Sequence, residues 1–233
     1  MSGIIAGRTI RGVTHTTISD LMKNNPTLNI ERFIDEATDD GWRLVLMDKY
    51  GKKHIPQGTR VKFGYVDDAR EYFTILEGKY KNEKASLTKE PHSYLTSRNR
   101  IKPKAELKLY KKQKKLEVNG KTYDAFSGTG FFEDFSTGGA IPTGKYYLEM
   151  PDEPHSELGN TYKDETKYAT SWFRIAYIDG GGYVDDRYLH AGYNSLGCIT
   201  VYDIKAWTEI YEDLIYRRID RYSGKVGIIE VFD

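Results

Sequence analysis

The sequence contains one cysteine in 233 residues. A single cysteine excludes an intramolecular disulfide and any zinc site built on several cysteines. Of the five histidines, His15, His54 and His92 are scattered along the chain and form no ligand set. We therefore expect no metal site and no other cofactor.

Long apolar runs are also missing. No stretch approaches the roughly 20 apolar residues that a membrane-spanning helix needs. The opening sequence MSGIIAGRTIRG has only a short apolar patch, whereas a secretory signal needs an apolar core of about 7–15 residues. We expect a soluble protein with no membrane span. Action outside the cytoplasm would then imply another export route or a trimmed chain.

The net charge of +1 hides one basic segment. Between Lys79 and Lys121 there are fourteen Lys and Arg against four Glu, a net of +10, so the remainder sums to −9. A solvated linker and turn would account for this segment, and the alternative is attraction to an anionic polymer such as a cell wall or nucleic acid. No pattern typical of sequence-specific nucleic-acid binding is present, so we expect no nucleic-acid partner.

The first third of the chain mixes helix and strand signals. Thr17 followed by Asp20 predicts a capped helix, and helical spacing over 29–41 predicts a second helix ending at Gly41. Strand patterns follow at 42–48 and 59–66. We assign residues 1–80 to a small α+β unit whose role no motif decides, and 81–104 to a basic linker.

From residue 105 the pattern becomes mostly β. Asn119-Gly120 between extended runs predicts a hairpin. Near the end, apolar residues at helical spacing over 203–215, with Asp203 as N-cap, predict one helix. Residues 105–233 are therefore expected to form a mostly-β domain with one packed helix, which makes the whole chain α+β.

The nine residues HAGYNSLGC, 190–198, hold the only thiol. A thiol attacks as thiolate and needs a nearby base, and His190 lies eight residues upstream across a turn-like segment. Gly197 would allow a sharp turn, and the amides of Gly197 and Cys198 could face an oxyanion. A lone cysteine is, however, more often a small buried hydrophobe than a nucleophile. Spacing alone leaves both interpretations open.

Three ordered motifs change this balance. KKLEVNGKTYDAFSGTG, AIPTGKYYLE and LHAG…SLGCITV, across residues ~106–201, resemble the L,D-transpeptidase catalytic domain, or YkuD, family. The resemblance implies a mostly-β sandwich-like fold. It also implies a cysteine that attacks a peptidoglycan stem peptide to form a thioester. An amine acceptor then gives cross-linking or D-amino-acid exchange, and water gives L,D-carboxypeptidase cleavage.

The same resemblance implies the roles of individual residues. Cys198 is the nucleophile, His190 is the general base, and Gly197 and Cys198 supply oxyanion amides. Ser195 and Gly192 shape the loop.

The sequence departs from the cell-wall housekeeping members of the family. Leu196 stands where they usually have His, and Thr200 stands where they have Arg or Asn. The compact loop is closer to the L,D-transpeptidase-like toxins delivered by type VI secretion. That resemblance implies action in the periplasm or cell wall. It also implies, as partners, an immunity protein or a secretion carrier.

Four further residues are weaker substrate-binding candidates. His155 is either a surface-loop histidine or a contact at the cleft edge. Arg174 and Arg187 could bind a stem-peptide carboxylate or serve as ion-pair partners, and Tyr193 could line the cleft. DGGGYVDD, 179–186, has too few spaced oxygen ligands for calcium, and SGTG, 127–130, lacks the lysine of a phosphate loop.

Two other function classes remain open. A non-catalytic wall-binding or carrier protein with a degenerate domain would explain Leu196 and Thr200. A cysteine peptidase or amidase of another fold would need a mainly helical domain around the nucleophile, which the β-rich pattern disfavours.

Overall fold

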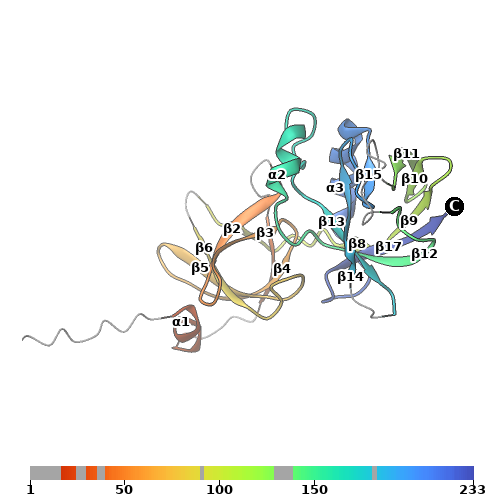
Figure 1. Ribbon diagram of the computed structural model, residues 1–233. Coiled ribbons are helices and arrows are strands. Elements are labelled where there is room, and N and C mark those ends of the chain that lie inside the picture. The colour runs from red at the N-terminus through yellow and green to blue at the C-terminus, as the bar shows by residue number, and fades with distance from the viewer. Residues whose placement is uncertain (1–16, 25–29, 36–39, 90–91, 129–138, 180–182) are drawn as a thin grey trace, which may run out of the picture.

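The computed structural model describes residues 17–24, 30–35, 40–89, 92–128, 139–179 and 183–233, and Figure 1 shows two groups of strands. The first group is a seven-stranded sheet in the order β3-β2-β6-β5-β4-β1-β7. Its elements are α1 (Ile18–Asn24), β1 (Ile30–Ile34), β2 (Trp42–Met47), β3 (Gly51–Pro56), β4 (Arg60–Val66), β5 (Arg70–Ile75), β6 (Lys84–Thr88) and β7 (Leu95–Thr96).

Helix α1 begins as the sequence predicts. The Thr17 hydroxyl accepts a hydrogen bond from the Asp20 backbone N–H, and the Asp20 carboxylate accepts one from the Thr17 N–H. This reciprocal arrangement satisfies backbone donors that the first helical turn leaves free. The predicted cap is confirmed.

The predicted helix at 29–41 is wrong. Its first residues form β1, which pairs with β4 on one side and β7 on the other. Phe33 and Ile34 are buried in this position. Pairing on both edges satisfies the backbone of a short segment rich in β-branched and aromatic residues, and this outweighs an apparent helical spacing.

The predicted linker at 81–104 is also wrong in its first part. β6 lies between β5 and β2 in the middle of the sheet, and it buries Ala85, Ser86 and Leu87. The flanking lysines conceal this short buried strand in the sequence. β7 belongs to the same sheet, so the first unit extends to Thr96 rather than ending near residue 80.

The second group of strands closes on itself in the order β10-β11-β15-β14-β13-β12-β17-β9. Its strands are β9 (Ala105–Tyr110), β10 (Lys115–Val118), β11 (Lys121–Phe126), β12 (Gly144–Glu149), β13 (Phe173–Tyr177), β14 (Tyr183–Ala191), β15 (Ile199–Val201) and β17 (Lys225–Phe232). The β10–β11 hairpin turns at Asn119 and Gly120, both with positive φ, as predicted. The expectation of a mostly-β architecture is confirmed.

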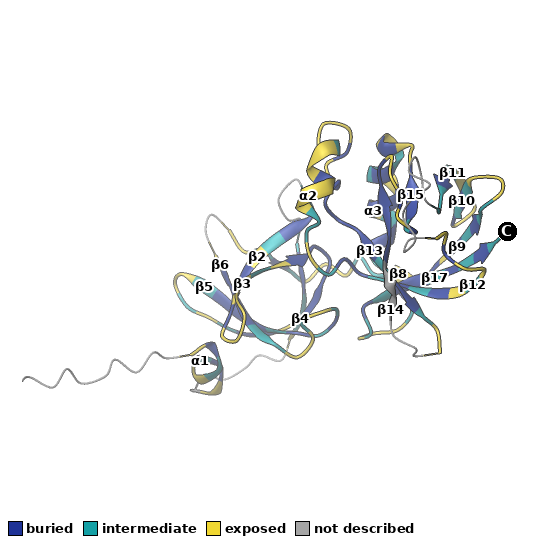
Figure 2. Cartoon of the chain, in the orientation of Figure 1, coloured by how far each residue is buried: buried dark blue, intermediate teal, exposed yellow. Residues whose placement is uncertain are grey.

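One helix packs against this barrel. α3 (Trp207–Leu214) buries Trp207, Ile210, Tyr211 and Leu214, and a short 3₁₀ turn, η2 (Ile204–Ala206), precedes it. The Asp203 side chain accepts a hydrogen bond from the Ala206 N–H, so the predicted cap is confirmed. Figure 2 shows buried residues along the strands and on α3, with exposed residues concentrated in the connecting loops and on α2 (Ser156–Gly159).

A buried ion pair joins the two units. The Arg218 guanidinium, in the short strand β16 (Arg217–Arg218), lies 2.8 Å from the Glu77 carboxylate, and both side chains are almost fully buried. Arg218 also donates to the Gly58 carbonyl, and Glu77 accepts from the Arg60 N–H. β16 pairs in parallel with β8 (Lys102–Pro103) of the connecting segment.

The basic segment between Lys79 and Lys121 is distributed over both units. Many of its side chains form ion pairs with carboxylates elsewhere, including Lys79 with Glu153 and Lys102 with Asp213. The structure therefore favours the solvated-surface interpretation for most of this segment. Among the described residues, no helix is long and apolar enough to cross a membrane.

Candidate active site

Cys198 and His190 lie on two neighbouring parallel strands. β14 carries His190, and β15 begins one residue after Cys198. The register pairs His190 with Thr200, so Cys198 precedes the partner of His190 by two residues. The parallel pairing thus brings the two predicted catalytic residues to the same part of the barrel wall. Cys198 is partly exposed, and its thiol is free.

The loop before Cys198 is held by hydroxyl groups. Ser195, which is buried, donates from its Oγ to the Cys198 carbonyl at 2.7 Å. Ser127, at the end of β11, donates to the Gly197 carbonyl at 3.1 Å and accepts from the Ile141 N–H at 2.9 Å. These bonds fix the backbone on both sides of the thiol.

Gly197 is required by its conformation and its surroundings. Its φ of +96° is one that other residues rarely adopt. A Cβ at this position would lie 2.8 Å from the Gly139 carbonyl oxygen and 3.1 Å from the Arg187 guanidinium carbon. Gly192, at the other end of the loop, donates from its N–H to the Val201 carbonyl.

Two contacts set the protonation pattern of the His190 ring. Nδ1 lies 2.8 Å from the Ala191 carbonyl oxygen, which can only accept, so Nδ1 carries the proton. Nε2 therefore holds a lone pair, and it lies 3.3 Å from the Thr200 hydroxyl. That hydroxyl also lies 3.2 Å from the Asn194 carbonyl, so its single proton can serve only one of the two acceptors at a time.

Burial disfavours the charged forms of both His190 and Cys198, and therefore disfavours a thiolate–imidazolium ion pair. Burial lowers the pKa of His190 to about 4, the hydrogen bond to Ala191 opposes this shift, and the charge of His155 adds to it. Burial raises the pKa of the Cys198 thiol, while the Tyr188 backbone N–H and the Arg187 charge act in the opposite direction. At neutral pH the site thus holds a neutral imidazole and a thiol.

His190 forms part of an aromatic stack. Its ring stacks on Trp172 with centroids 4.2 Å apart, and the His155 ring also stacks on Trp172 at 4.3 Å. The Trp172 Nε1–H donates to the Ala169 carbonyl, which fixes the indole. Tyr188 completes the cluster with an edge contact to His155. This stack restricts rotation of the His190 ring.

Arg187 lies beside the cysteine loop. Its side chain is buried and its guanidinium packs against Gly197. Within the part of the chain that the structure describes, its Nε and Nη1 atoms are buried without a hydrogen-bond partner. A buried guanidinium in this condition is costly, and an anionic group of a ligand would satisfy it.

The remaining candidates lie elsewhere. Arg174 forms an ion pair with Asp152 at 3.6 Å, which is the ion-pair alternative weighed for it. His155 is not a surface-loop histidine, because its ring is stacked on Trp172 and lies 3.7 Å from Asp152. Tyr193 is half exposed and reaches Glu165 through its hydroxyl.

No group of His, Cys, Asp and Glu that could hold a metal ion occurs among the described residues. Part of the glycine-rich segment 179–186 and part of the SGTG segment lie outside those residues.

Comparisons with known proteins return L,D-transpeptidases of solved structure. An L,D-transpeptidase fragment from Xylanimonas cellulosilytica matches at 15% identity and a TM-score of 0.31, over 57% of this chain and 62% of that one. L,D-transpeptidase 1 of Mycobacterium tuberculosis matches at 13% identity and a TM-score of 0.33, over 83% and 87%. A further L,D-transpeptidase from M. tuberculosis H37Rv matches at 12% and 0.32, over 76% and 77%.

The alignment thus spans less than two thirds of the first of these chains. No protein-family model and no curated protein matches this sequence. At this level of similarity, function has to be read from the side chains around Cys198.

Sequence reasoning missed three residues of the site. Trp172 lies one residue before β13 and Ser127 lies one residue after β11, so neither is near Cys198 in the sequence. Thr200 was noted only as a departure from the family pattern, yet its hydroxyl faces the His190 Nε2. The alternation of side chains along paired strands was the one available signal for Thr200.

Proposed function

We propose that the protein is a cysteine-dependent acyltransferase that acts on peptidoglycan stem peptides through a thioester on Cys198. One observation carries the proposal: a partly exposed thiol lies immediately before β15, the strand that pairs with β14 at His190, and this buried, neutral histidine has its Nδ1–H fixed by the Ala191 carbonyl. A fixed imidazole with a free lone pair is the form that a general base requires. The three ordered motifs supply the substrate class.

In the proposed first step, His190 Nε2 takes the thiol proton as sulfur attacks the carbonyl carbon. The amides of Gly197 and Cys198 stabilise the oxyanion. The C–N bond then breaks, the proton passes from His190 to the leaving amine, and the acyl group remains on sulfur. Water or an acceptor amine attacks the thioester and restores the thiol, so that hydrolysis or exchange follows.

Arg187 is the proposed substrate carboxylate ligand. It is buried beside Gly197 and leaves two guanidinium nitrogens without partners among the described residues. Arg174 is already paired with Asp152 and is less suited to this role. A carboxylate bound at Arg187 would position the scissile bond against Cys198 and would select peptides with a nearby carboxylate.

The biological setting that we propose is an antibacterial effector delivered by type VI secretion. The compact HAGYNSLGC loop supports this setting. Such a protein would act in the periplasm of a competitor, release or exchange the terminal D-amino acid, and require an immunity protein in the producing cell.

The test is mass spectrometry of purified muropeptides incubated with the protein, with and without added D-amino acids. Loss of the terminal residue indicates hydrolysis, its replacement indicates exchange, and a joined product indicates cross-linking. Cys198→Ala should abolish every product while retaining the wild-type circular dichroism spectrum. Undiminished products from that variant would refute the proposal.

A second candidate is a non-catalytic wall-binding protein. The raised pKa of Cys198, the lowered pKa of His190 and the Thr200 hydroxyl facing Nε2 favour it. This candidate predicts that the wild-type protein sediments with purified cell walls but releases no product. Turnover in the muropeptide assay excludes it.

A further inference from the structure

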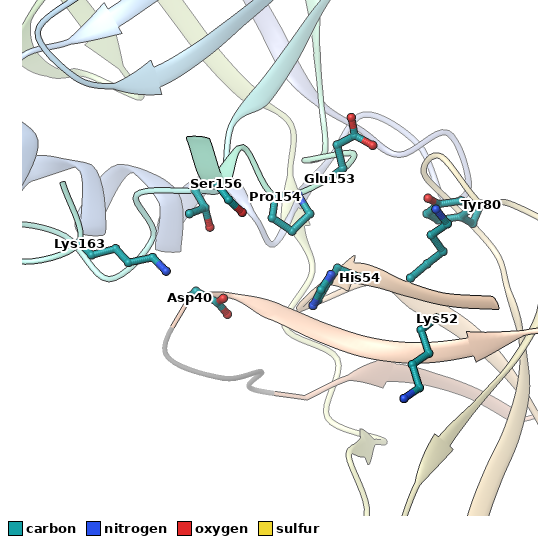
Figure 3. A pocket seen from close by; sticks show the side chains of 10 residues that line it. Asp40, Lys52, His54, Tyr80, Glu153, Pro154, Ser156 and Lys163 are labelled. Atoms are coloured by element: carbon teal, nitrogen blue, oxygen red, sulfur yellow. The ribbon is translucent and has the colours of Figure 1, made fainter. Parts of the chain in front are cut away.

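A pocket of about 360 Å³ lies where the two units meet, outside the site around Cys198. One wall comes from the first sheet, with Asp40 before β2 and Lys53 and His54 on β3. The other wall comes from the barrel unit, with Ser156 and Lys163. Figure 3 shows Lys163 and Ser156 on one side of this space, and Asp40 and His54 on the other. Neither unit could form the pocket alone.

The pocket carries an excess of positive charge. Lys52, Lys53 and Lys163 line it, and among the described residues none of the three has an ion-pair partner. The acidic residues in the lining are Asp40 and Glu153, and Glu153 is already paired with Lys79 at 2.7 Å. The Asp40 carboxylate accepts a hydrogen bond from the Trp42 N–H at 3.2 Å. The lining therefore holds three lysines and two carboxylates that already have partners, which favours an anionic occupant.

A buried hydroxyl also lines the pocket. Thr170 is 2% exposed, and its Oγ1 is buried without a hydrogen-bond partner within the described chain. A buried hydroxyl without a partner destabilises the folded protein unless a water or a ligand satisfies it. Its position in the pocket wall gives an occupant a specific hydrogen-bond partner in addition to the lysine charges.

The two walls are held in place by direct contacts. The Ser171 hydroxyl, next to Thr170, donates to the Asp40 carbonyl at 3.0 Å and so ties one wall to the other. The His155 N–H, next to Ser156, donates to the Thr170 carbonyl at 2.9 Å. With the Lys79–Glu153 pair, these bonds preform the pocket and reduce the ordering that binding would require.

We propose that this junction pocket binds an acidic group on a sugar-sized ligand, and, resting on the proposed action on peptidoglycan, that this ligand is a unit of a cell-wall polymer. The volume is at the small end of ligand pockets and fits one such unit. The acid is a carboxylate of peptidoglycan or a phosphate ester of a polyol phosphate polymer, which share the same recognition by lysine and hydroxyl. The first unit thereby contributes to binding of the wall.

The test is a calorimetric titration of the full chain with N-acetylmuramic acid, with glycerol 3-phosphate and with neutral N-acetylglucosamine. We expect saturable binding of at least one acid, weakened by salt, and none of the neutral sugar. Tighter binding of N-acetylmuramic acid would identify peptidoglycan as the source of the acidic group, and tighter binding of glycerol 3-phosphate would identify a polyol phosphate polymer. Because binding is measured without turnover, the result is independent of acyl transfer at Cys198.

Three variants locate the site. Lys163→Gln and Lys53→Gln should each weaken binding about tenfold, since each removes a charged contact. Lys112→Gln, an exposed lysine in the turn after β9, should leave binding unchanged. The proposal is overturned if neither acid binds below about 20 mM, if the neutral sugar binds equally well, or if the pocket variants match Lys112→Gln.

Discussion

At the scale of single residues, His190 combines deep burial with a lone pair at Nε2. A histidine with a lowered folded-state pKa is neutral when folded, whereas the unfolded chain binds a proton below about pH 6.5. Its contribution to stability is therefore complete above pH 6.5 and is lost as the pH falls toward about 4. The free energy of unfolding should fall by about 3 kcal/mol over this window because of this one group.

Urea denaturation at pH 7 and pH 4.5 measures this effect. His190→Gln should remove most of the pH dependence, whatever its own stability, because glutamine does not titrate. An unchanged slope in His190→Gln would contradict the burial of a neutral imidazole.

The second residue-scale prediction concerns the thiol. Because burial raises the pKa of Cys198, the rate of alkylation by iodoacetamide should rise with a midpoint above that of an ordinary thiol, about pH 8.5. Arg187→Gln should shift the midpoint to still higher pH, because the guanidinium charge lowers the pKa. Arg187→Lys, which keeps the charge, should shift it less. A wild-type midpoint near pH 6 would instead indicate a preformed thiolate–imidazolium pair.

The sequence was sufficient to predict which site residues come together where those residues are close along the chain. Cys198, His190, Gly197 and Ser195 fall within nine positions, so a local turn was enough to suggest their association. Trp172 and Ser127 reach the same place through strand pairing. That pairing is a tertiary property, and no spacing in a single sequence contains it.

At the scale of elements, the loop from Gly192 to Cys198 depends on one glycine conformation. Gly197→Ala would place a Cβ at a positive φ and 2.8 Å from the Gly139 carbonyl, so we expect a loss of about 1–3 kcal/mol in the free energy of unfolding. Gly120→Ala, also at positive φ but with open space around its Cβ, is the matched control. Turnover should fall much more in Gly197→Ala than in the control, and equal turnover would contradict the role of the loop.

Secondary-structure elements were predicted correctly where they depend on interactions between residues that are neighbours in the sequence. The Asn119-Gly120 turn and the Asp203 cap depend on neighbouring backbone groups, and both occur as expected. β1 and β6 depend on partners far away in sequence, and there the predictions fail. Helical spacing at 29–41 was outweighed by pairing with β4 and β7.

At the scale of the whole molecule, the Glu77–Arg218 pair connects the two units. Breaking a buried pair leaves an uncompensated charge, so Arg218→Leu should cost about 3–5 kcal/mol. The double variant Glu77→Leu/Arg218→Leu should recover part of this loss, because neither charge then remains buried. Chemical denaturation of the three proteins checks this prediction, and a loss below about 1 kcal/mol in Arg218→Leu would contradict it.

The central claim is that Cys198 carries the acyl group. Acid-quenched reactions of the wild-type protein with a tetrapeptide muropeptide, digested and mapped by mass spectrometry, test it directly. We predict that the peptide containing Cys198 gains the mass of the acyl donor and loses it on treatment with hydroxylamine, as a thioester should. An acyl group on another residue, or continued turnover by Cys198→Ala, would contradict the claim.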